Sequence, residues 1–283
     1  LDILLAEPDR AAASRQTLPV RLAQAPAGGE APPPDPDAEL ARTIAAGRVV
    51  TGFALVKVAS TALPAAKATV TWQGSRQPAM LPAAPGAVAT LPMLEQDAAG
   101  NGSLSISLAT GGVIRQLPLL VRLGDRVYPS LTAEALRVAQ GADDYVVRLA
   151  SDGAITDVRI GAFRIPTDAA GRLWLYSSKP MEGSRYLPAW RVLDGSAPRD
   201  AVAGDVVLIG STARGLQDVH QTPLGDDIPG VEFHAQALEQ VIHEEYLRRP
   251  AWIKAAELGL LLGLGMLVLV IGAQLGPSAS AVL

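Results

Sequence analysis

The chain has 283 residues, of which 49% are hydrophobic and 18% are charged, so it can bury a sizeable core as one large domain or two small ones. Its net charge is -4 and no basic run is longer than Arg248-Arg249, which argues against a nucleic acid partner, because phosphate binding needs a concentrated basic face. Since there is no cysteine, disulfides, zinc thiolate sites and cysteine nucleophiles are excluded.

The N-terminal part predicts a strand, a helix and a second strand. The apolar run Leu1–Leu5 reads as a strand, Asp37–Ala46 as a helix stopped by Gly47, and Arg48–Val56 as the next strand. This order is a βαβ unit and implies parallel strand pairing. The segment Gln24–Asp37 is so rich in proline, glycine and aspartate that we expect a mobile surface loop.

The middle of the chain predicts short strands around one helix. Two alternating runs on either side of Gly111-Gly112 indicate a β-hairpin. Ser130 is a preferred N-cap and Gly141 a preferred C-terminal residue, which predicts a helix over Ser130–Gln140. The expected strands of this region are Ala68–Trp72, Ser103–Ala109, Val113–Leu119, Tyr145–Leu149, Ala162–Ile165 and Leu173–Tyr176, the last following a turn at Gly171.

The last part of the domain predicts a strand, a long loop and a helix. Asp205–Ile209 is short and apolar, as strands buried on both faces are. A loop over residues 211–230 follows, and then a helix from Val231 to about Leu247. Its apolar positions share one face: Val231, Ala235, Leu238, Val241 and Ile242.

The C-terminal stretch Leu258–Ala273 contains no charge and no proline, and it reaches spanning length with the apolar residues at its ends. A buried helix of a soluble core is the alternative, but a leucine run with spaced glycines favours a membrane helix. We therefore predict a domain over residues 1–250, a transmembrane helix over 251–275, and the start of a further apolar segment over 276–283.

The loop after Asp205–Ile209 carries candidate ligand-binding residues. Gly210 and Gly215 have the spacing of a Walker A loop, but Leu216-Gln217 stand where that loop needs lysine and a hydroxyl residue, which argues against triphosphate hydrolysis. The loop is then either a weak anion site at the end of a strand or a simple turn. The candidates for ligand contact are Ser211, Thr212, Arg214, Asp218 and His234.

His234 lies on the apolar stripe of the predicted last helix. A neutral, hydrogen-bonded core histidine is the default interpretation, and a ligand contact is the functional alternative. His243 falls on the opposite side of that helix and His220 in the loop, so three scattered histidines predict no metal site, and we expect no cofactor. Ser211 and Asp218 with one of the histidines also lack the spacing of a hydrolase, so we expect no catalytic site.

Five motifs in order together resemble one family: VYPSLTAEAL at 127–136, FRIPTDAAGRLWLYSS at 163–178, YLPAWRVLDG at 186–195, DVVLIGSTARGLQDVHQTPLG at 205–225 and PGVEFHAQALEQVI at 229–242. The chain resembles the CHASE type 2 extracellular sensor domains, closely from about Val127 onwards and more loosely over Leu1–Val56. The resemblance implies an exported input domain between membrane helices, with a nucleotide cyclase or protein kinase as a dimeric cytoplasmic output.

The sequence therefore predicts a three-layer α/β sandwich with a mixed, largely parallel sheet and a β-rich insertion, followed by the membrane helix. We expect a homodimer in the bacterial inner membrane, with most of this chain extracytoplasmic and the stimulus, a small molecule or a protein, unknown. The signal would pass through the helix 231–247. The alternatives are a membrane-anchored periplasmic α/β enzyme and a protein-interaction module.

Overall fold

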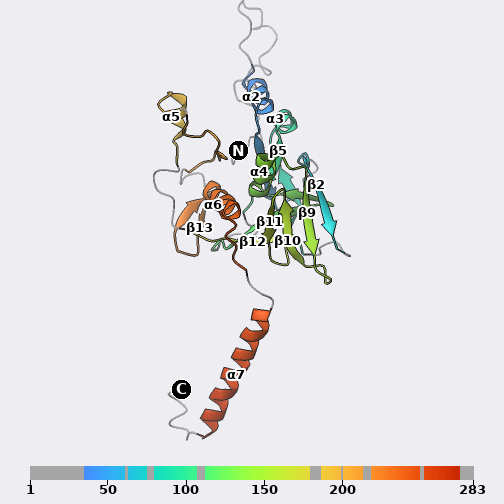
Figure 1. Cartoon of the computed structure of the whole chain (residues 1–283), viewed down its shortest axis with the longest axis vertical. Coiled ribbons are helices and arrows are strands. Elements are labelled where there is room, and N and C mark those ends of the chain that lie inside the picture. The colour runs from blue at the N-terminus through green and yellow to red at the C-terminus, as the bar shows by residue number, and fades with distance from the viewer. Residues whose placement is uncertain are drawn as a thin grey trace, which may run out of the picture. The chain divides into compact units, whose positions relative to one another are not determined.

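A computed structural model describes residues 35–60, 63–74, 80–106, 112–178, 186–198, 200–212, 218–248 and 252–274. The chain divides into two compact units, residues 1–247 and 248–283, which are described separately (Figure 1). The predicted strand Leu1–Leu5, most of the loop 24–37 and the segment 276–283 lie outside the described residues.

The predicted first helix and second strand are confirmed. Helix α2 (Pro36–Ala45) is capped by the side chain of Asp35 and packs on helix α3 (Pro92–Asp97) through Ile44 and Leu94, both almost fully buried. Strand β1 (Val50–Val56) pairs in parallel with β5 (Gly100–Ser103) and antiparallel with β4 (Gly86–Val88).

The remaining strands build small sheets beside this one. A four-stranded sheet has the order β11-β10-β9-β2, and two shorter sheets are β3-β7-β8 and β12-β6. Their strands are β2 (Thr69–Gln73), β3 (Ala83–Ala84), β6 (Gln116–Pro118), β7 (Leu120–Leu123), β8 (Arg126–Pro129), β9 (Asp144–Leu149), β10 (Ile155–Ile160), β11 (Phe163–Pro166) and β12 (Arg172–Trp174).

The fold is mixed α/β, as predicted, but the expectation of largely parallel pairing is wrong. Of the nine strand pairings in the described part of the chain, six are antiparallel and three parallel. Short turns cause this: β7–β8 and β10–β11 are hairpins that turn at glycines with positive φ, Gly124 and Gly161. The three-layer arrangement stays a prediction.

The hairpin predicted around Gly111-Gly112 is also wrong in its described flanks. Ser103 ends β5 and pairs with β1, whereas β6 pairs with β12. The position of strand β5 depends on its packing against the helix that contains Leu131, and not on the segment that follows it in sequence. A Cβ atom added at Gly102 would lie only 2.6 Å from the Cα atom of Leu131, so glycine lets the helix approach closely.

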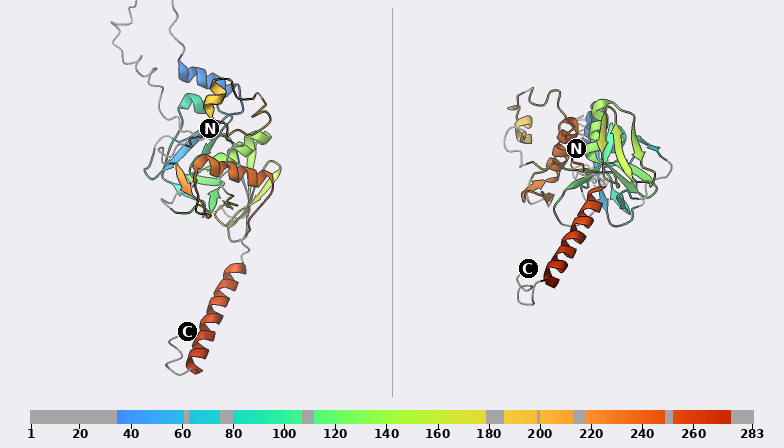
Figure 2. Two further views of the ribbon diagram at one scale, coloured as in Figure 1. Left: turned by 90° about the vertical axis from the view of Figure 1, so that its left-hand side faces the viewer. Right: turned by 60° about the horizontal axis from the view of Figure 1, so that its bottom comes forward.

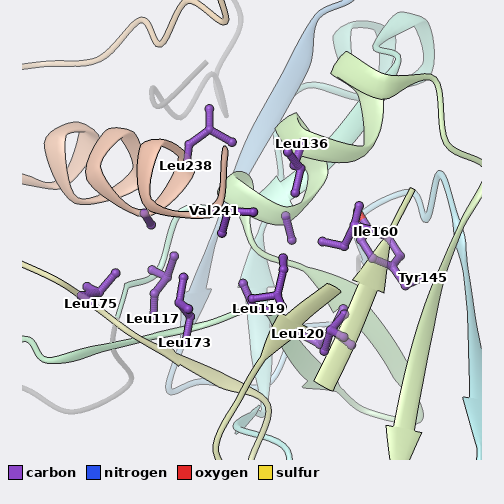
Figure 3. Packing of buried hydrophobic residues seen from close by; sticks show 14 of the residues in the cluster. Leu117, Leu119, Leu120, Leu136, Tyr145, Ile160, Leu173, Leu175, Leu238 and Val241 are labelled. Atoms are coloured by element: carbon purple, nitrogen blue, oxygen red, sulfur yellow. The ribbon is translucent and has the colours of Figure 1, made fainter. Parts of the chain in front are cut away.

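Helix α4 (Leu131–Gln140) is confirmed together with both of its predicted ends. The Ser130 hydroxyl accepts a hydrogen bond from the Ala133 amide (3.3 Å), and Gly141 adopts φ 64° to end the helix. Figure 3 shows α4 and the last domain helix above one apolar cluster, with Leu136 and Val241 facing Leu119. This cluster is the main core of the domain.

A buried ionic network fixes α4. Arg137 donates two hydrogen bonds to the Glu134 carboxylate (2.9 and 2.8 Å), and the Tyr145 hydroxyl donates to the same carboxylate. Arg137 also donates to the carbonyl oxygens of Ala142 and Ala99. Because both charges are paired and hydrogen-bonded, the network joins α4 to β9 and to the residue before β5.

The last domain helix, α6 (Gly230–Ile242), begins where predicted but ends five residues early. His243 is its C-cap, and Glu244 has φ 57°, the left-handed conformation that closes a helix. The Glu244 and Glu245 amides donate to the Val241 and Gln240 carbonyls in a Schellman pattern. The predicted apolar stripe itself stops at Ile242, so the extension to Leu247 had no periodic support.

The predicted strand Asp205–Ile209 is wrong. These residues form no strand in the structure, and Val206, Val207 and Ile209 are 41%, 49% and 51% exposed. Leu208 alone packs against a core cluster, which contains Val50, Leu131 and Val138. A short apolar run is an ambiguous signal for a strand, because its sequence does not show whether another part of the protein will pack on it.

The preceding segment includes a short helix, α5 (Ala189–Leu193), that has no buried residue. Figure 1 shows it set apart from the sheets. The predicted loop 211–230 holds a hairpin, β13 (Val219–Gln221) with β14 (Asp227–Pro229).

The described part of the second unit is mostly one long helix, α7 (Trp252–Gln274). The segment Ala255–Gly272 has a mean hydropathy of 2.2 and none of it is buried inside the structure, so by length and composition this helix could cross a membrane. This fits the predicted transmembrane segment. Gly259 and Gly263 lie one helical turn apart on it.

Candidate functional site at the start of helix α6

The structure brings two of the five candidate residues together and leaves the others less defined. Asp218 and His234 lie at the start of α6 with His220 beside them. Ser211 is half-buried and Thr212 exposed, and neither makes a side-chain hydrogen bond to another described residue. Arg214 lies outside the described residues, so a ligand contact by this set stays a prediction.

Two glycines, Gly210 and Gly230, allow the chain before the β13–β14 hairpin to contact the start of α6. The Gly230 amide donates to the Asp218 carbonyl (3.1 Å), and a Cβ atom at Gly230 would lie 2.4 Å from Asp218 Oδ2. A Cβ atom at Gly210 would lie 2.5 Å from the Cβ atom of Val231. The chain before the β13–β14 hairpin therefore lies directly against the first turn of α6.

Asp218 carries negative charge at this helix end. Its Oδ1 lies 3.2 Å from His220 Nε2, and this hydrogen bond is the main cause that lowers the pKa of the Asp218 carboxyl. A carboxylate here also suits the positive end of the helix dipole. A free anion would meet this carboxylate at the helix end, which argues against the anion-site interpretation of the loop.

His234 is a core histidine, as the default interpretation held. It is fully buried, with Nδ1 2.9 Å from the Thr132 hydroxyl oxygen and Nε2 3.3 Å from the Leu104 carbonyl oxygen. Because a carbonyl only accepts, Nε2 carries the proton and Nδ1 accepts from Thr132. Burial lowers the pKa of His234 to about 4, so the ring is neutral at pH 7.

Ser211, Asp218 and the histidines do not come together as a triad, and the described residues hold no metal-ligating cluster. No hydrogen bond joins Ser211 to Asp218, His220 or His234, and within the described ranges no group of three potential metal-ligating side chains comes together. Asp218, His220 and His234 therefore contribute packing and hydrogen bonds at the start of α6.

Sequence reasoning missed the polar contacts that attach α6 to the rest of the domain. Gln240 donates to the Trp174 carbonyl (2.8 Å) and accepts from the Tyr176 amide (2.9 Å), so its amide group pairs with the backbone at the end of β12. Glu232 accepts from the Tyr186 hydroxyl (2.5 Å) and from Gln236. A signal existed in the sequence, because Glu232, Gln236 and Gln240 recur every four residues along the helix.

Comparison with known proteins identifies the family. The CHASE2 domain matches residues 1–273, and the chain belongs to the CHASE2 family. No curated protein and no solved structure matches the chain. CHASE2 domains are extracellular sensory domains of signalling proteins, so the chain is a sensory domain of this class.

Proposed function

We propose that this chain is the extracytoplasmic input domain of a bacterial inner-membrane signalling protein that acts as a homodimer. Its cytoplasmic output would be a nucleotide cyclase or a protein kinase. The observation that carries the proposal is the CHASE2 match over residues 1–273, which includes both the α/β domain and the apolar helix α7. The match favours this role over a periplasmic enzyme or a simple interaction module.

The chain order supports α6 as the last helix of the α/β domain on the signal path. Nine residues, 243–251, separate the end of α6 from the start of α7. Within this stretch Tyr246 is partly buried against the main core, and its hydroxyl lies 3.4 Å from the Val241 carbonyl. A change in how α6 packs would therefore reach the connection to α7 through Tyr246. This replaces the continuous helix 231–247 as the proposed route.

The spacing of Gly259 and Gly263 supports the dimer. Small residues four apart let two membrane helices approach closely. A ligand that binds one conformation of the domain better would shift the dimer towards that conformation.

The test replaces Arg248-Arg249-Pro250 by Gly-Ser-Gly in the full-length protein. Cyclic nucleotide synthesis and protein phosphorylation are then measured in membranes. Uncoupling the domain should change basal output by about fivefold or more, the lower end of common coupling energies.

The matched control places the same tripeptide at Ser151-Asp152-Gly153, an exposed turn between β9 and β10 that ends in a glycine with φ 85°. This variant should keep the original output. Equal output from both variants and the parent would disprove coupling through the connection, and membranes with neither activity would disprove the proposed output.

A further inference from the structure

We propose that His234 is an acid-sensitive latch that holds α6 against α4, and that acidification of the surrounding medium releases this helix. Acid would then be a stimulus of the domain. The latch itself is a property of the α/β domain, and only its use as a signal rests on the proposed sensory function.

The geometry of the latch joins three elements through one ring. His234 belongs to α6, its Nδ1 partner Thr132 lies in the first turn of α4, and its Nε2 partner Leu104 follows β5. Helices α4 and α6 contact each other directly (Figure 2). The ring is fully buried, so both bonds lie in the protein interior.

The contact at Nδ1 is the one that protonation changes, because Nε2 donates to the Leu104 carbonyl in either state. A second proton on Nδ1 would point at the Thr132 oxygen, whose hydroxyl now donates to that nitrogen. The Thr132 hydroxyl would have to turn its hydrogen towards the His234 carbonyl (3.5 Å) and accept from Nδ1, so the new charge would have only neutral hydrogen-bond partners. A buried charge without a charged hydrogen-bond partner is strongly unfavourable.

The charged groups around the ring do not offset this cost. From the β13–β14 side Asp218 and His220 act on His234, but Asp218 is already paired with His220 and is half-exposed. On α4, Glu134 is paired with Arg137 and Tyr145, and on α6 itself Glu232 bonds Tyr186 and Gln236. In the part of the chain that the structure describes, no carboxylate hydrogen-bonds His234.

The direction of the pH effect follows from linkage. The unfolded or released ring has the ordinary pKa near 6.5, whereas the packed ring has a pKa of about 4. The stabilisation by the packed ring is complete above pH 6.5 and is lost as the pH falls towards 4, because the released state binds the extra proton. Across this window the release equilibrium should grow by about tenfold per pH unit.

Asp218 acts in a different range. Its pKa is lowered below 3.8, so the stability that its pairing contributes is present above that value and disappears only at lower pH. A transition between pH 6.5 and 4 would therefore report His234 and not this carboxylate.

The experiment uses the fact that the chain has only three histidines. Hydrogen exchange of the purified chain in detergent is measured from pH 7 to 4, with correction for the intrinsic exchange rate. The backbone amides of α6 are compared with those of α4. Exchange in α6 should accelerate by about a hundredfold or more relative to α4 over this range. His234→Gln, which cannot take up a proton, should lose the pH dependence.

His243→Gln is the matched control, because His243 is exposed at the end of the same helix and bonds only the Glu239 carbonyl. It should behave as the parent does. A pH-independent parent, or a His234→Gln variant that keeps the transition, would overturn the latch.

A direct titration guards against a variant that fails to fold. The three imidazole signals of the parent chain can be followed by NMR, and a His234 signal that titrates at pH 6 or above overturns the proposal. Neither measurement uses the cytoplasmic output. Failure of the latch is therefore distinct from failure of the proposed function, which the connection variant tests at neutral pH.

Discussion

Helices α4 and α6 cover the same apolar core, yet they are attached to it by different chemistry. Helix α4 holds a buried ion pair, with Glu134 bonded to Arg137 and Tyr145. Helix α6 is held by hydrogen bonds through His234, Gln240 and the Glu232 carboxylate. The pKa of Tyr145 is raised, mainly by burial, and that of Arg137 is raised, mainly by its bond to Glu134, so both keep their protons at any ordinary pH. The comparison indicates a fixed helix beside one that can be released.

The largest expected effect comes from breaking the ion pair of α4. Glu134→Ala leaves a buried guanidinium without its carboxylate, and we expect a loss of about 3–5 kcal/mol in the free energy of unfolding. Urea denaturation of the purified chain measures it. Glu245→Ala, which removes an exposed carboxylate after α6, should stay within about 0.5 kcal/mol of the parent. If Glu134→Ala costs no more than this control, α4 is not held by its ionic network.

Gln240→Ala should break one attachment of α6 at a smaller cost. The change leaves the Trp174 carbonyl and the Tyr176 amide without their partner, and an unsatisfied buried polar group costs about 1–3 kcal/mol. The same denaturation experiment applies. Gln73→Ala, on the exposed edge strand β2, is the control for losing an amide side chain. Amide exchange in α6 should increase more than in α4, and the reverse pattern would contradict the comparison.

The smallest expected effect is a gain in stability. Both helices end in a Schellman pattern, but α4 has Gly141 in the left-handed position and α6 has Glu244. Glycine adopts this conformation without a Cβ penalty, so Glu244→Gly should stabilise the domain by about 0.5–1 kcal/mol. Thermal denaturation measures the gain. A destabilised variant would show that the Glu244 side chain, and not its backbone, closes the helix.

Elements with local signals were predicted well. The cap at Ser130 and the stop at Gly141 located α4, because capping involves atoms within one turn of the chain. The start of α6 and the burial of His234 followed from one apolar stripe. The hairpin β13–β14 was missed, although Pro223 and Gly225 at its turn are turn residues.

The sequence by itself determined the mixed α/β composition, the helix ends that carry caps, the apolar helix α7 and the neutral state expected of His234. Only the tertiary structure decided which strands pair, since β5 joins β1 and β6 joins β12 across long separations in the chain. It also decided that Asp205–Ile209 is largely exposed and that Gln240 binds the backbone at the end of β12. The physical reason is that caps and periodicity act within a few residues, whereas strand partners and buried polar contacts depend on which distant surfaces meet.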